Sequence, residues 1–202
     1  MLRCRIGAGN SKMKIGVLAL QGSVKEHKEM LMKCGAEPVE VRLPHDLDNV
    51  YGLIIPGGES TTISKLMKQY KLDKEITRKY HIGMPIYGSC AGAIVLAKTI
   101  LPNNQSSLRL IDITAKRNDY GRQIDSFETD LEIEGIGNYK GIFIRAPTLE
   151  ITNGVKILAR FDGKPVMVQH DDILVTTFHP ELTEDARVHQ YFIDMIKKKS
   201  RY

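Results

Sequence analysis

The sequence lacks long apolar runs. Nowhere in its 202 residues do about 18 or more apolar residues follow one another, and no charged segment leads into an apolar one with a small-residue cleavage site. We therefore expect neither a membrane span nor a secretory signal. The expected location is the cytoplasm, with no membrane partner.

Cysteine is scarce and unevenly spaced. Cys4, Cys34 and Cys90 are an odd number, separated by 30 and 56 residues. This spacing fits neither a disulfide framework nor a zinc site, so reduced thiols are expected. We expect no metal and no cofactor.

Excess positive charge is confined to the two ends of the chain. The formal net charge is +5. Without seven cations near the two ends of the chain, the remaining residues carry a net charge of −2; these cations are Arg3, Arg5, Lys12, Lys197, Lys198, Lys199 and Arg201. A body of this charge does not predict nucleic-acid binding. Residues 1–12 are expected to be a disordered or cloning-derived extension, and residues 13–202 a single domain.

The first half of the chain alternates between strand and helix patterns. Apolar runs at 15–20 and 51–55 are typical of central strands, and a further strand is expected at 39–43. The first helix should begin at Ser23, with Glu26 completing a capping box, and should bury Cys34 in the core before Gly35 ends it. Later helices are expected through 66–67, at about 73–80 and at about 184–198.

The second half is richer in strand patterns. Strands are expected at 108–114, 126–133, 141–144, 156–161, 165–169 and 173–178, appended to the same sheet. The predicted fold class is α/β: a single domain with a mostly parallel sheet flanked by helices and extra strands in the second half. Ligands bind such sheets at the carboxyl ends of the strands.

A tight strand-to-helix turn surrounds Cys90. Residues 84–97 run from an apolar strand through Gly88-Ser-Cys-Ala-Gly92 directly into an apolar helix. This is the pattern of a nucleophile elbow, in which small neighbours permit a strained backbone and the helix N-terminus favours a thiolate. The N–H of Ala91 would face a developing oxyanion. The alternative is a buried, inert cysteine.

A second loop offers backbone donors. Pro56-Gly-Gly-Glu-Ser-Thr-Thr62 follows a buried strand and precedes a helix, an arrangement that exposes N–H groups to an anion. It lacks the Gly-Lys-Ser/Thr of a phosphate-binding loop and the three glycines of a dinucleotide site. Nucleotide binding is therefore not predicted.

A candidate general base stands at a later strand end, in His179-Pro180-Glu181. The proline restricts His179. Because side chains two positions apart in an extended chain share a side, Glu181 could accept a proton from one ring nitrogen while the other faces a thiol. The remaining histidines are expected to be structural or solvated: His27, His45, His81, His170 and His189. Together with Cys90 and the Gly57-Gly58 loop, this motif predicts acyl transfer through a thioester.

The motifs resemble a known family. Gly88-Ser-Cys-Ala-Gly92 with His179-Pro-Glu181 is similar to the class I glutamine amidotransferases, which have a flavodoxin-like fold. Further segments resemble the glutaminase subunits of pyridoxal 5'-phosphate synthase: Leu20–Gly22, Pro56–Thr62, Arg117–Glu128, Phe143–Pro147 and Phe178–Asp185. This resemblance covers the chain from Met13 to the last helix. Ser89 and Tyr120 are mild departures from it.

The resemblance implies hydrolysis of L-glutamine to glutamate and ammonia. The ammonia would pass to a separate synthase subunit, in a hetero-oligomeric complex that makes pyridoxal 5'-phosphate, and the chain alone would be poorly active. By position, Cys90, His179 and Glu181 would be the catalytic triad. Glutamine would contact Gly58, Glu59, Ser60, Arg117, Ile144 and Arg145, and the oxyanion hole would be Gly57, Gly58 and Ala91.

Two alternatives stay open at this point. A cysteine hydrolase or peptidase acting on another substrate would share the elbow around Cys90. A non-catalytic binding module would carry an unreactive cysteine there. Assays with glutamine, with a peptide and with an alkylating glutamine analogue distinguish the three.

Overall fold

The computed structural model describes residues 12–102, 105–117, 126–152 and 154–199. Its first part alternates strands and helices: β1 (Lys14–Leu18), α1 (Val24–Lys33), β2 (Glu37–Val41), the 3₁₀ helix η1 (Pro44–Asn49), β3 (Leu53–Ile55), α2 (Ser60–Gln69), α3 (Leu72–His81), β4 (Ile86–Ser89) and α4 (Ala91–Leu96). Its second part is mostly strands: β5 (Ala97–Leu101), β6 (Ile111–Lys116), β7 (Ser126–Ile133), β8 (Gly137–Ile144), β9 (Thr148–Ile151), β10 (Lys156–Phe161), β11 (Lys164–His170), β12 (Ile173–Thr176), the 3₁₀ helix η2 (Pro180–Leu182) and α5 (Arg187–Lys199).

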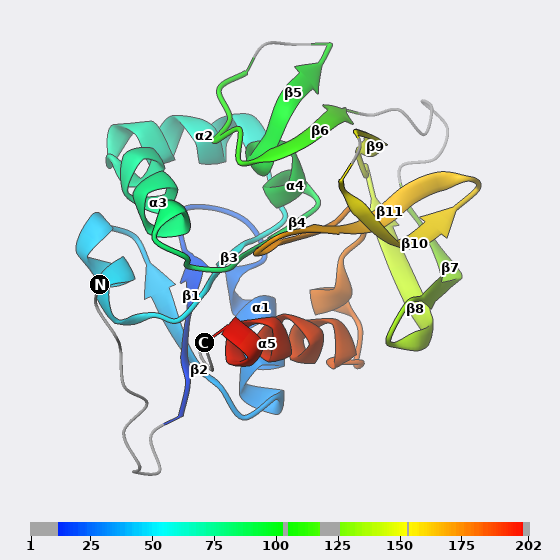
Figure 1. Ribbon diagram of the computed structural model, residues 1–202, viewed down its shortest axis with the longest axis horizontal. Coiled ribbons are helices and arrows are strands. Elements are labelled where there is room, and N and C mark those ends of the chain that lie inside the picture. Colours follow the sequence, from blue (N-terminus) through cyan, green and yellow to red (C-terminus); the bar gives the residue numbers. More distant parts are fainter. Residues whose placement is uncertain (1–11, 103–104, 118–125, 153, 200–202) are drawn as a thin grey trace.

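A seven-stranded sheet forms the centre of the molecule, with the order β10-β11-β12-β4-β3-β1-β2 (Figure 1). Strands β2, β1, β3, β4 and β12 are parallel to one another, while β11 pairs antiparallel with β12, and β10 pairs antiparallel with β11 at one edge. The expected α/β fold with a mostly parallel sheet is confirmed.

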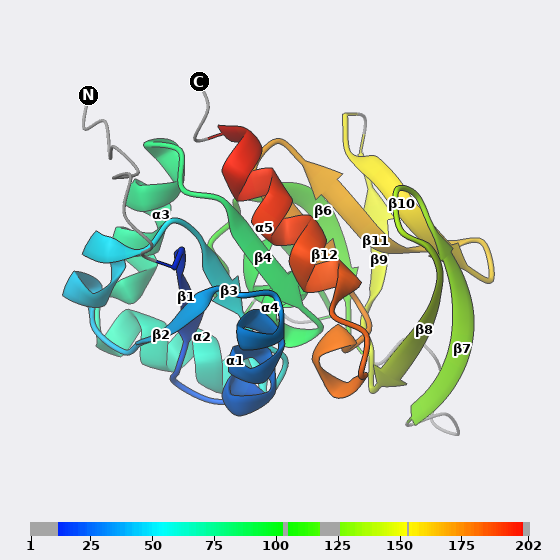
Figure 2. The same ribbon diagram turned by 90° about the horizontal axis from the view of Figure 1, so that it is seen from below.

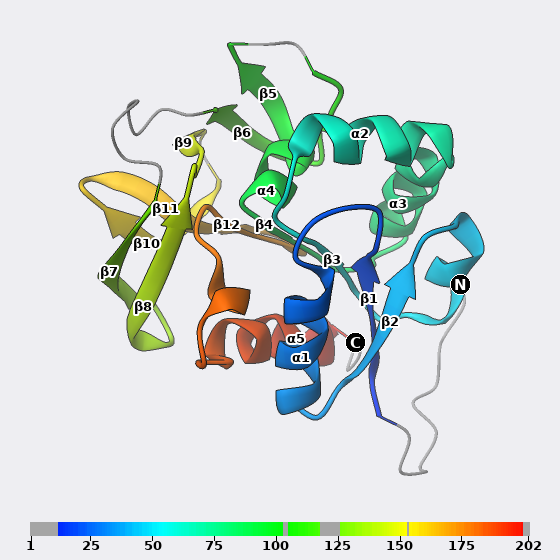
Figure 3. The same ribbon diagram turned by 180° about the vertical axis from the view of Figure 1, so that it is seen from behind.

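Helices cover both faces of this sheet. Figure 2 shows α1 and α5 on one face, and Figure 3 shows α2, α3 and α4 on the other. Because successive side chains of a strand point to opposite faces, Leu53 and Ile55 enter the core beneath α2 and α3, whereas Ile54 enters the core beneath α1 and α5. The uninterrupted apolar runs of the sequence therefore serve two cores.

The later strands do not all join the central sheet, so this part of the expectation was wrong. Strands β5, β6 and β9 form a separate three-stranded sheet, and β7 and β8 form a two-stranded hairpin beside β10. The hairpin buries only one face, where Phe127 stacks on Phe143 at a ring distance of 4.6 Å and lies near Phe161. Antiparallel strands that bury only one face can pack on a core in this way without pairing with the central sheet.

Two local expectations about α1 were also wrong. Ser23 is the N-cap residue, but its side chain makes no capping hydrogen bond, because its Oγ donates to Oε1 of Glu181 at 2.7 Å. Cys34 is half-buried at the C-cap rather than enclosed in the core, with its Sγ 3.6 Å from the carbonyl oxygen of Ala186.

Residues 1–11, most of the expected N-terminal extension, lie outside the described residues. Within the described part of the chain, no helix is both long enough and apolar enough to cross a membrane.

Candidate active site

The candidate site lies at the carboxyl ends of three neighbouring parallel strands. Strand β3 leads to Gly57, β4 to Cys90 and β12 to His179. The strands are paired in register, with Ile55 opposite Gly88 and Thr176 opposite Ser89. Residues that are far apart in the sequence therefore meet at one edge of the sheet.

Cys90 occupies the strained turn that the motif predicts. Its backbone angles are φ 47° and ψ −100°, outside the regions that most residues adopt, and its N–H donates to the carbonyl oxygen of Thr176 at 2.8 Å. Helix α4 passes so close to β3 that a Cβ on Gly92 would lie 2.1 Å from the carbonyl oxygen of Ile55. The Sγ of Cys90 lies 3.8 Å from the carbonyl oxygen of Ile144.

His179 stands beside Cys90 and is aimed by Glu181. Its Nδ1 lies 2.8 Å from Oε1 of Glu181, and its side chain is hydrogen-bonded to Cys90. Only a glycine fits at position 57 beside these two side chains, since a Cβ there would lie 2.5 Å from Cε1 of His179 and 3.5 Å from Cβ of Cys90. The structure thus brings Cys90, His179 and Glu181 together.

Hydrogen bonds and neighbouring charges shift the pKa values of His179 and Glu181 so that both groups are ionised. Burial by itself would lower the pKa of His179, but its hydrogen bonds to Cys90 and Glu181 outweigh burial and raise this pKa to about 10. Burial would raise the pKa of Glu181, but His27, His179 and Ser23 together lower it to about 2. At neutral pH a protonated imidazole therefore lies between the sulfur and a carboxylate.

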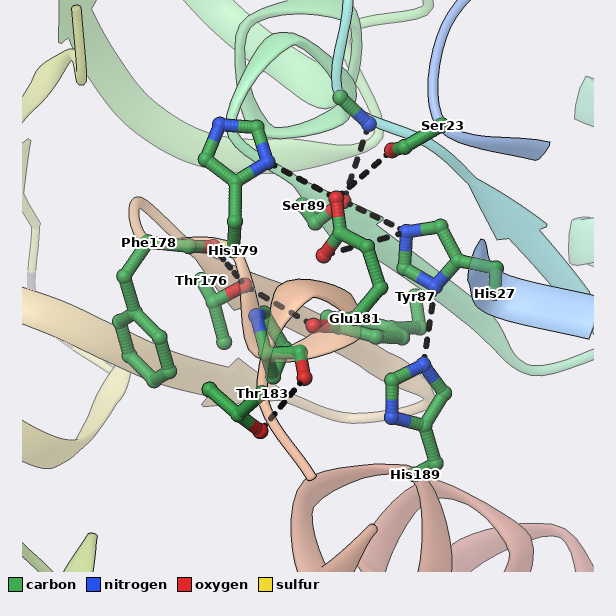
Figure 4. Close-up of polar contacts among 12 residues, drawn as sticks. Ser23, His27, Tyr87, Ser89, Thr176, Phe178, His179, Glu181, Thr183 and His189 are labelled. Atoms are coloured by element: carbon green, nitrogen blue, oxygen red, sulfur yellow. Dashed lines mark hydrogen bonds and ion pairs between the residues drawn. The ribbon is translucent and has the colours of Figure 1, made fainter. Parts of the chain in front are cut away.

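Glu181 is almost completely enclosed. It lies in η2 rather than in the extended chain that the sequence suggested, and its Oε1 accepts hydrogen bonds from Ser23 and His179 (Figure 4). Its Oε2 lies 3.5 Å from Nε2 of His27. Several neighbours thus hold the carboxylate in place.

The Gly57-Gly58 loop is held in a definite conformation. The N–H of Gly57 donates to Oγ of Ser89 at 3.0 Å, and the N–H of Glu59 donates to Oε1 of Gln21 at 2.7 Å. In this conformation the Gly57 N–H is already engaged, which differs from the free oxyanion donor that the sequence suggested. Ala91 begins α4 directly after Cys90.

A polar cluster lies at the N-terminus of α2. Glu59 is the N-cap residue, and its Oε1 lies 3.3 Å from Nη2 of Arg117. The other Arg117 nitrogen, Nη1, donates to Oγ1 of Thr61 at 3.3 Å and to Oε1 of Gln105 at 3.2 Å. Buried Ser60 donates to the same Gln105 oxygen at 3.2 Å. Three of the residues expected to contact glutamine therefore lie together.

Two other expected contacts lie at the end of β8. Ile144 is its last residue, and Arg145 follows with a left-handed φ of 42°. Ile144 borders Cys90 through the contact of its carbonyl oxygen with the thiol. Tyr120, noted as a departure from the family pattern, lies outside the described residues.

Sequence reasoning missed several neighbours of the site. His27 and His189 are fully buried, and their rings lie 2.9 Å apart between Nδ1 and Nε2 respectively. Gln105 was not recognised in the cluster around Arg117. No local signal could have found His27, because 154 positions separate it from Glu181 and only the packing of α1 against η2 brings them together.

The described residues include no group of three or more His, Cys, Asp or Glu side chains arranged to hold a metal ion. The residues of the site present instead a cysteine thiol, an imidazole and a carboxylate.

Comparison with known proteins identifies the family. Residues 17–198 match the model of the SNO glutamine amidotransferase family. The chain is 50% identical over 188 residues to the protein named pyridoxal 5'-phosphate synthase subunit PdxT in Desulforamulus reducens, and it has the same identity to PdxT of Thermotoga maritima. Each alignment covers 92% of this chain and 100% of the relative.

Solved structures give a consistent result. One described as a glutamine amidotransferase has a TM-score of 0.88 and 46% identity, over 91% of this chain and 98% of that chain. PurLQS from Thermotoga maritima has a TM-score of 0.66 at 19% identity, over 91% of this chain and 98% of that one, which shows a shared fold alone. The peptidase and binding-module alternatives are therefore not retained. The chain belongs to the SNO glutamine amidotransferase family, as its motifs suggested, and is an amide-hydrolysing enzyme of the glutaminase kind.

Proposed function

We propose that this chain hydrolyses L-glutamine to L-glutamate and ammonia, and that it delivers the ammonia to a pyridoxal 5'-phosphate synthase subunit in a hetero-oligomeric complex. The observation that carries the chemistry is the line from Cys90 through His179 to Glu181 at one sheet edge. The partner is inferred from relatives that are named as subunits of this synthase and that align over their full length.

In the first half of the reaction, the sulfur of Cys90 attacks the carboxamide carbon of glutamine. The carbonyl oxygen becomes an oxyanion, and we assign its stabilisation to the N–H of Ala91, the first residue of α4. The C–N bond then breaks, and the leaving nitrogen takes the proton held by His179 to leave as ammonia. A thioester joins the glutamyl group to Cys90.

In the second half, a water molecule attacks the thioester and gives a proton to His179. The C–S bond breaks, glutamate leaves, and the free Cys90 sulfur and the protonated imidazole are restored. Glu181 remains ionised throughout and keeps the ring aimed through its 2.8 Å contact with Nδ1.

We infer that the α-amino acid end of glutamine binds at the N-terminus of α2 and at the end of β8. A guanidinium such as that of Arg117 suits the α-carboxylate, and a carboxylate such as that of Glu59 suits the α-ammonium. The proximity of these two side chains supports the assignment. Gly58, Ser60, Ile144 and Arg145 are proposed to complete the contacts with glutamine, and Gly58 also to contribute to the oxyanion hole.

The test is ammonia release from glutamine by the chain together with its synthase partner. Cys90→Ala should abolish release while leaving folding and docking intact. Cys34→Ala is the matched control and should leave turnover unchanged, because this thiol lies at the C-cap of α1, where its Sγ contacts the carbonyl oxygen of Ala186. Retained turnover in Cys90→Ala would show that another group is the nucleophile.

A further inference from the structure

His27 of α1 is fully buried against the triad, although the reaction as described makes no use of it. Its Nε2 lies 3.0 Å from Oγ of Ser89 and 3.5 Å from Oε2 of Glu181. On the other side of the ring, Nδ1 lies 2.9 Å from Nε2 of His189 (Figure 4). One imidazole therefore contacts the triad carboxylate, the residue before the nucleophile and a second buried imidazole.

The positions of the partners determine which nitrogen of His27 carries the proton. Without a proton on Nε2, a lone pair would face the carboxylate of Glu181, which is repulsive. With the proton on Nε2, His27 donates a hydrogen bond to Oγ of Ser89 and turns the same N–H towards Oε2 of Glu181, which has no hydrogen-bond partner of its own among the described residues. The Nδ1 of His27 then accepts a hydrogen bond from Nε2–H of His189. The remaining His189 nitrogen, Nδ1, has no hydrogen-bond partner among the described residues. An unpaired acceptor at Nδ1 of His189 costs less free energy than a buried N–H donor without a partner would at the same position.

Both rings are neutral in this arrangement. Burial lowers the pKa of His27 despite the nearby Glu181, and burial together with His27 lowers the pKa of His189 to about 3. The neutral Nε2–H of His27 faces the Glu181 carboxylate. Because His27 carries no charge, it does not compete with the imidazolium of His179 for that carboxylate.

The contact with Ser89 extends the network to the oxyanion side of the site. Oγ of Ser89 accepts the N–H of Gly57, and Gly57 packs against the ring of His179. His27 thus contacts Glu181 directly and reaches the Gly57 peptide through a single hydroxyl. Ser23 joins the same two parts from another side, since its Oγ donates to Glu181 and its N–H donates to the carbonyl oxygen of Gly57 at 3.1 Å.

We infer that His27 is a positioning residue for glutamine hydrolysis: its Nε2–H binds Ser89 and faces the Glu181 carboxylate, so that His179 and the Gly57 peptide keep their relative positions, while His189 donates to its Nδ1. This inference rests on the proposed glutaminase function. His27 does not touch the Glu59 and Arg117 cluster, so its effect belongs to turnover and not to substrate binding.

Two substitutions separate the roles of the two ring nitrogens. His27→Gln places an amide N–H near the position of Nε2, whereas His27→Asn places its amide near Nδ1 and leaves Ser89 and Glu181 without this donor. In the complex with the synthase, His27→Asn should lower kcat by about 10²-fold, the scale of loss caused by a small misplacement of catalytic groups, with KM unchanged. His27→Gln should recover most of that loss. His45→Asn, at an exposed histidine, is the control and should match the wild type.

Coupling to Ser89 gives an independent measurement. In the His27→Asn background, Ser89→Ala should lower kcat by a clearly smaller factor than it does in the wild type, because His27 acts partly through this hydroxyl. Three results would overturn the inference, because a merely structural role predicts them. They are additive losses of kcat for His27→Asn and Ser89→Ala, equal kcat values for His27→Gln and His27→Asn, and a rise in KM without loss of kcat.

A second readout does not depend on activity. Histidine ¹⁵N spectra of the full chain, assigned with His27→Asn, should show His27 as the neutral Nε2–H tautomer at pH 7. An imidazolium or an Nδ1–H tautomer would refute the inference even if the kinetics agreed. Absence of glutamine hydrolysis by the wild-type complex would instead count against the proposed function, and the spectra would still decide the role of His27.

Discussion

Oγ of Ser89 accepts the N–H of Gly57 at 3.0 Å, directly beside Cys90. A peptide N–H that is engaged in this way cannot at the same time stabilise the oxyanion of a tetrahedral intermediate. This N–H belongs to the peptide between Pro56 and Gly57, and Gly57, which carries no Cβ, allows that peptide to turn over.

The first prediction concerns activation by the partner. The chain alone should hydrolyse glutamine on the order of 10²-fold more slowly than the complex with the synthase subunit, because one oxyanion donor is withheld. Ammonia release with and without the partner measures this difference. Alkylation of Cys90 by iodoacetamide, which needs no oxyanion hole, should differ far less between the two states. Full glutaminase activity of the purified chain would contradict the prediction.

The second prediction concerns the carboxylate that aims His179. Glu181→Gln should lower kcat by about 10²- to 10⁴-fold, because the amide does not stabilise the protonated imidazole. It should also lower the pKa of His179, which the hydrogen bond to Glu181 helps to raise. Ser23→Ala removes only one hydrogen bond to the same carboxylate and should cost about tenfold or less. Comparable losses in the two variants would show that the charge of Glu181 is not what matters.

The third prediction concerns substrate recognition. Arg117→Lys should raise KM for glutamine with a smaller effect on kcat, because a lysine cannot reproduce a two-pronged contact with a carboxylate. Gln105→Ala should raise KM less, since Gln105 acts by holding Arg117 at 3.2 Å. Arg160→Lys, whose guanidinium binds the carbonyl oxygen of Gly163 in the β10–β11 turn, is the control and should leave both constants unchanged. An unchanged KM in Arg117→Lys would remove Arg117 from the binding site.

The fourth prediction concerns stability in acid. The pKa of His189 is about 3 in the folded chain against an ordinary value of 6.5, so between these values only the unfolded chain binds the proton. The free energy of unfolding should therefore fall as the pH drops from 6.5 towards 3. Glu181, with a folded pKa of about 2 against 4.5, should extend the fall below pH 4.5, because it too is protonated first in the unfolded chain.

Urea unfolding at a series of pH values measures this loss. His189→Gln should lower the slope of unfolding free energy against pH by about 1.4 kcal/mol per pH unit within the His189 window, the value for one proton. His45→Gln, at an exposed site, should leave the slope as in the wild type. An unchanged slope in His189→Gln would mean that His189 is protonated in the folded state.

Local sequence was sufficient for the parts of the site that a few adjacent residues define. The elbow at Cys90 depends on small neighbours and on a strand that passes directly into a helix, and both are visible in the sequence. His179 and Glu181 are two positions apart, so their contact could be anticipated, although η2 rather than extended chain produces it.

Other features could not be foreseen from neighbouring residues. Ser23 has the sequence pattern of a helix cap, yet its hydroxyl binds Glu181, because a charged acceptor brought close by the fold competes with the local backbone. Strand β5 was missed because the apolar pattern of α4 continues into Ala97 without a break.

By itself, the sequence determined the family and most of the strand and helix order, and it indicated Cys90 and His179 as the candidate pair, because periodicity and compact motifs are local properties of the chain. Only the tertiary structure decided that His27 and His189 lie behind Glu181, that Ser89 holds the Gly57 peptide, and that β7 and β8 form their own hairpin. These contacts join residues separated by tens of positions or more, or depend on how whole elements pack, and packing is set by the shape of the entire core.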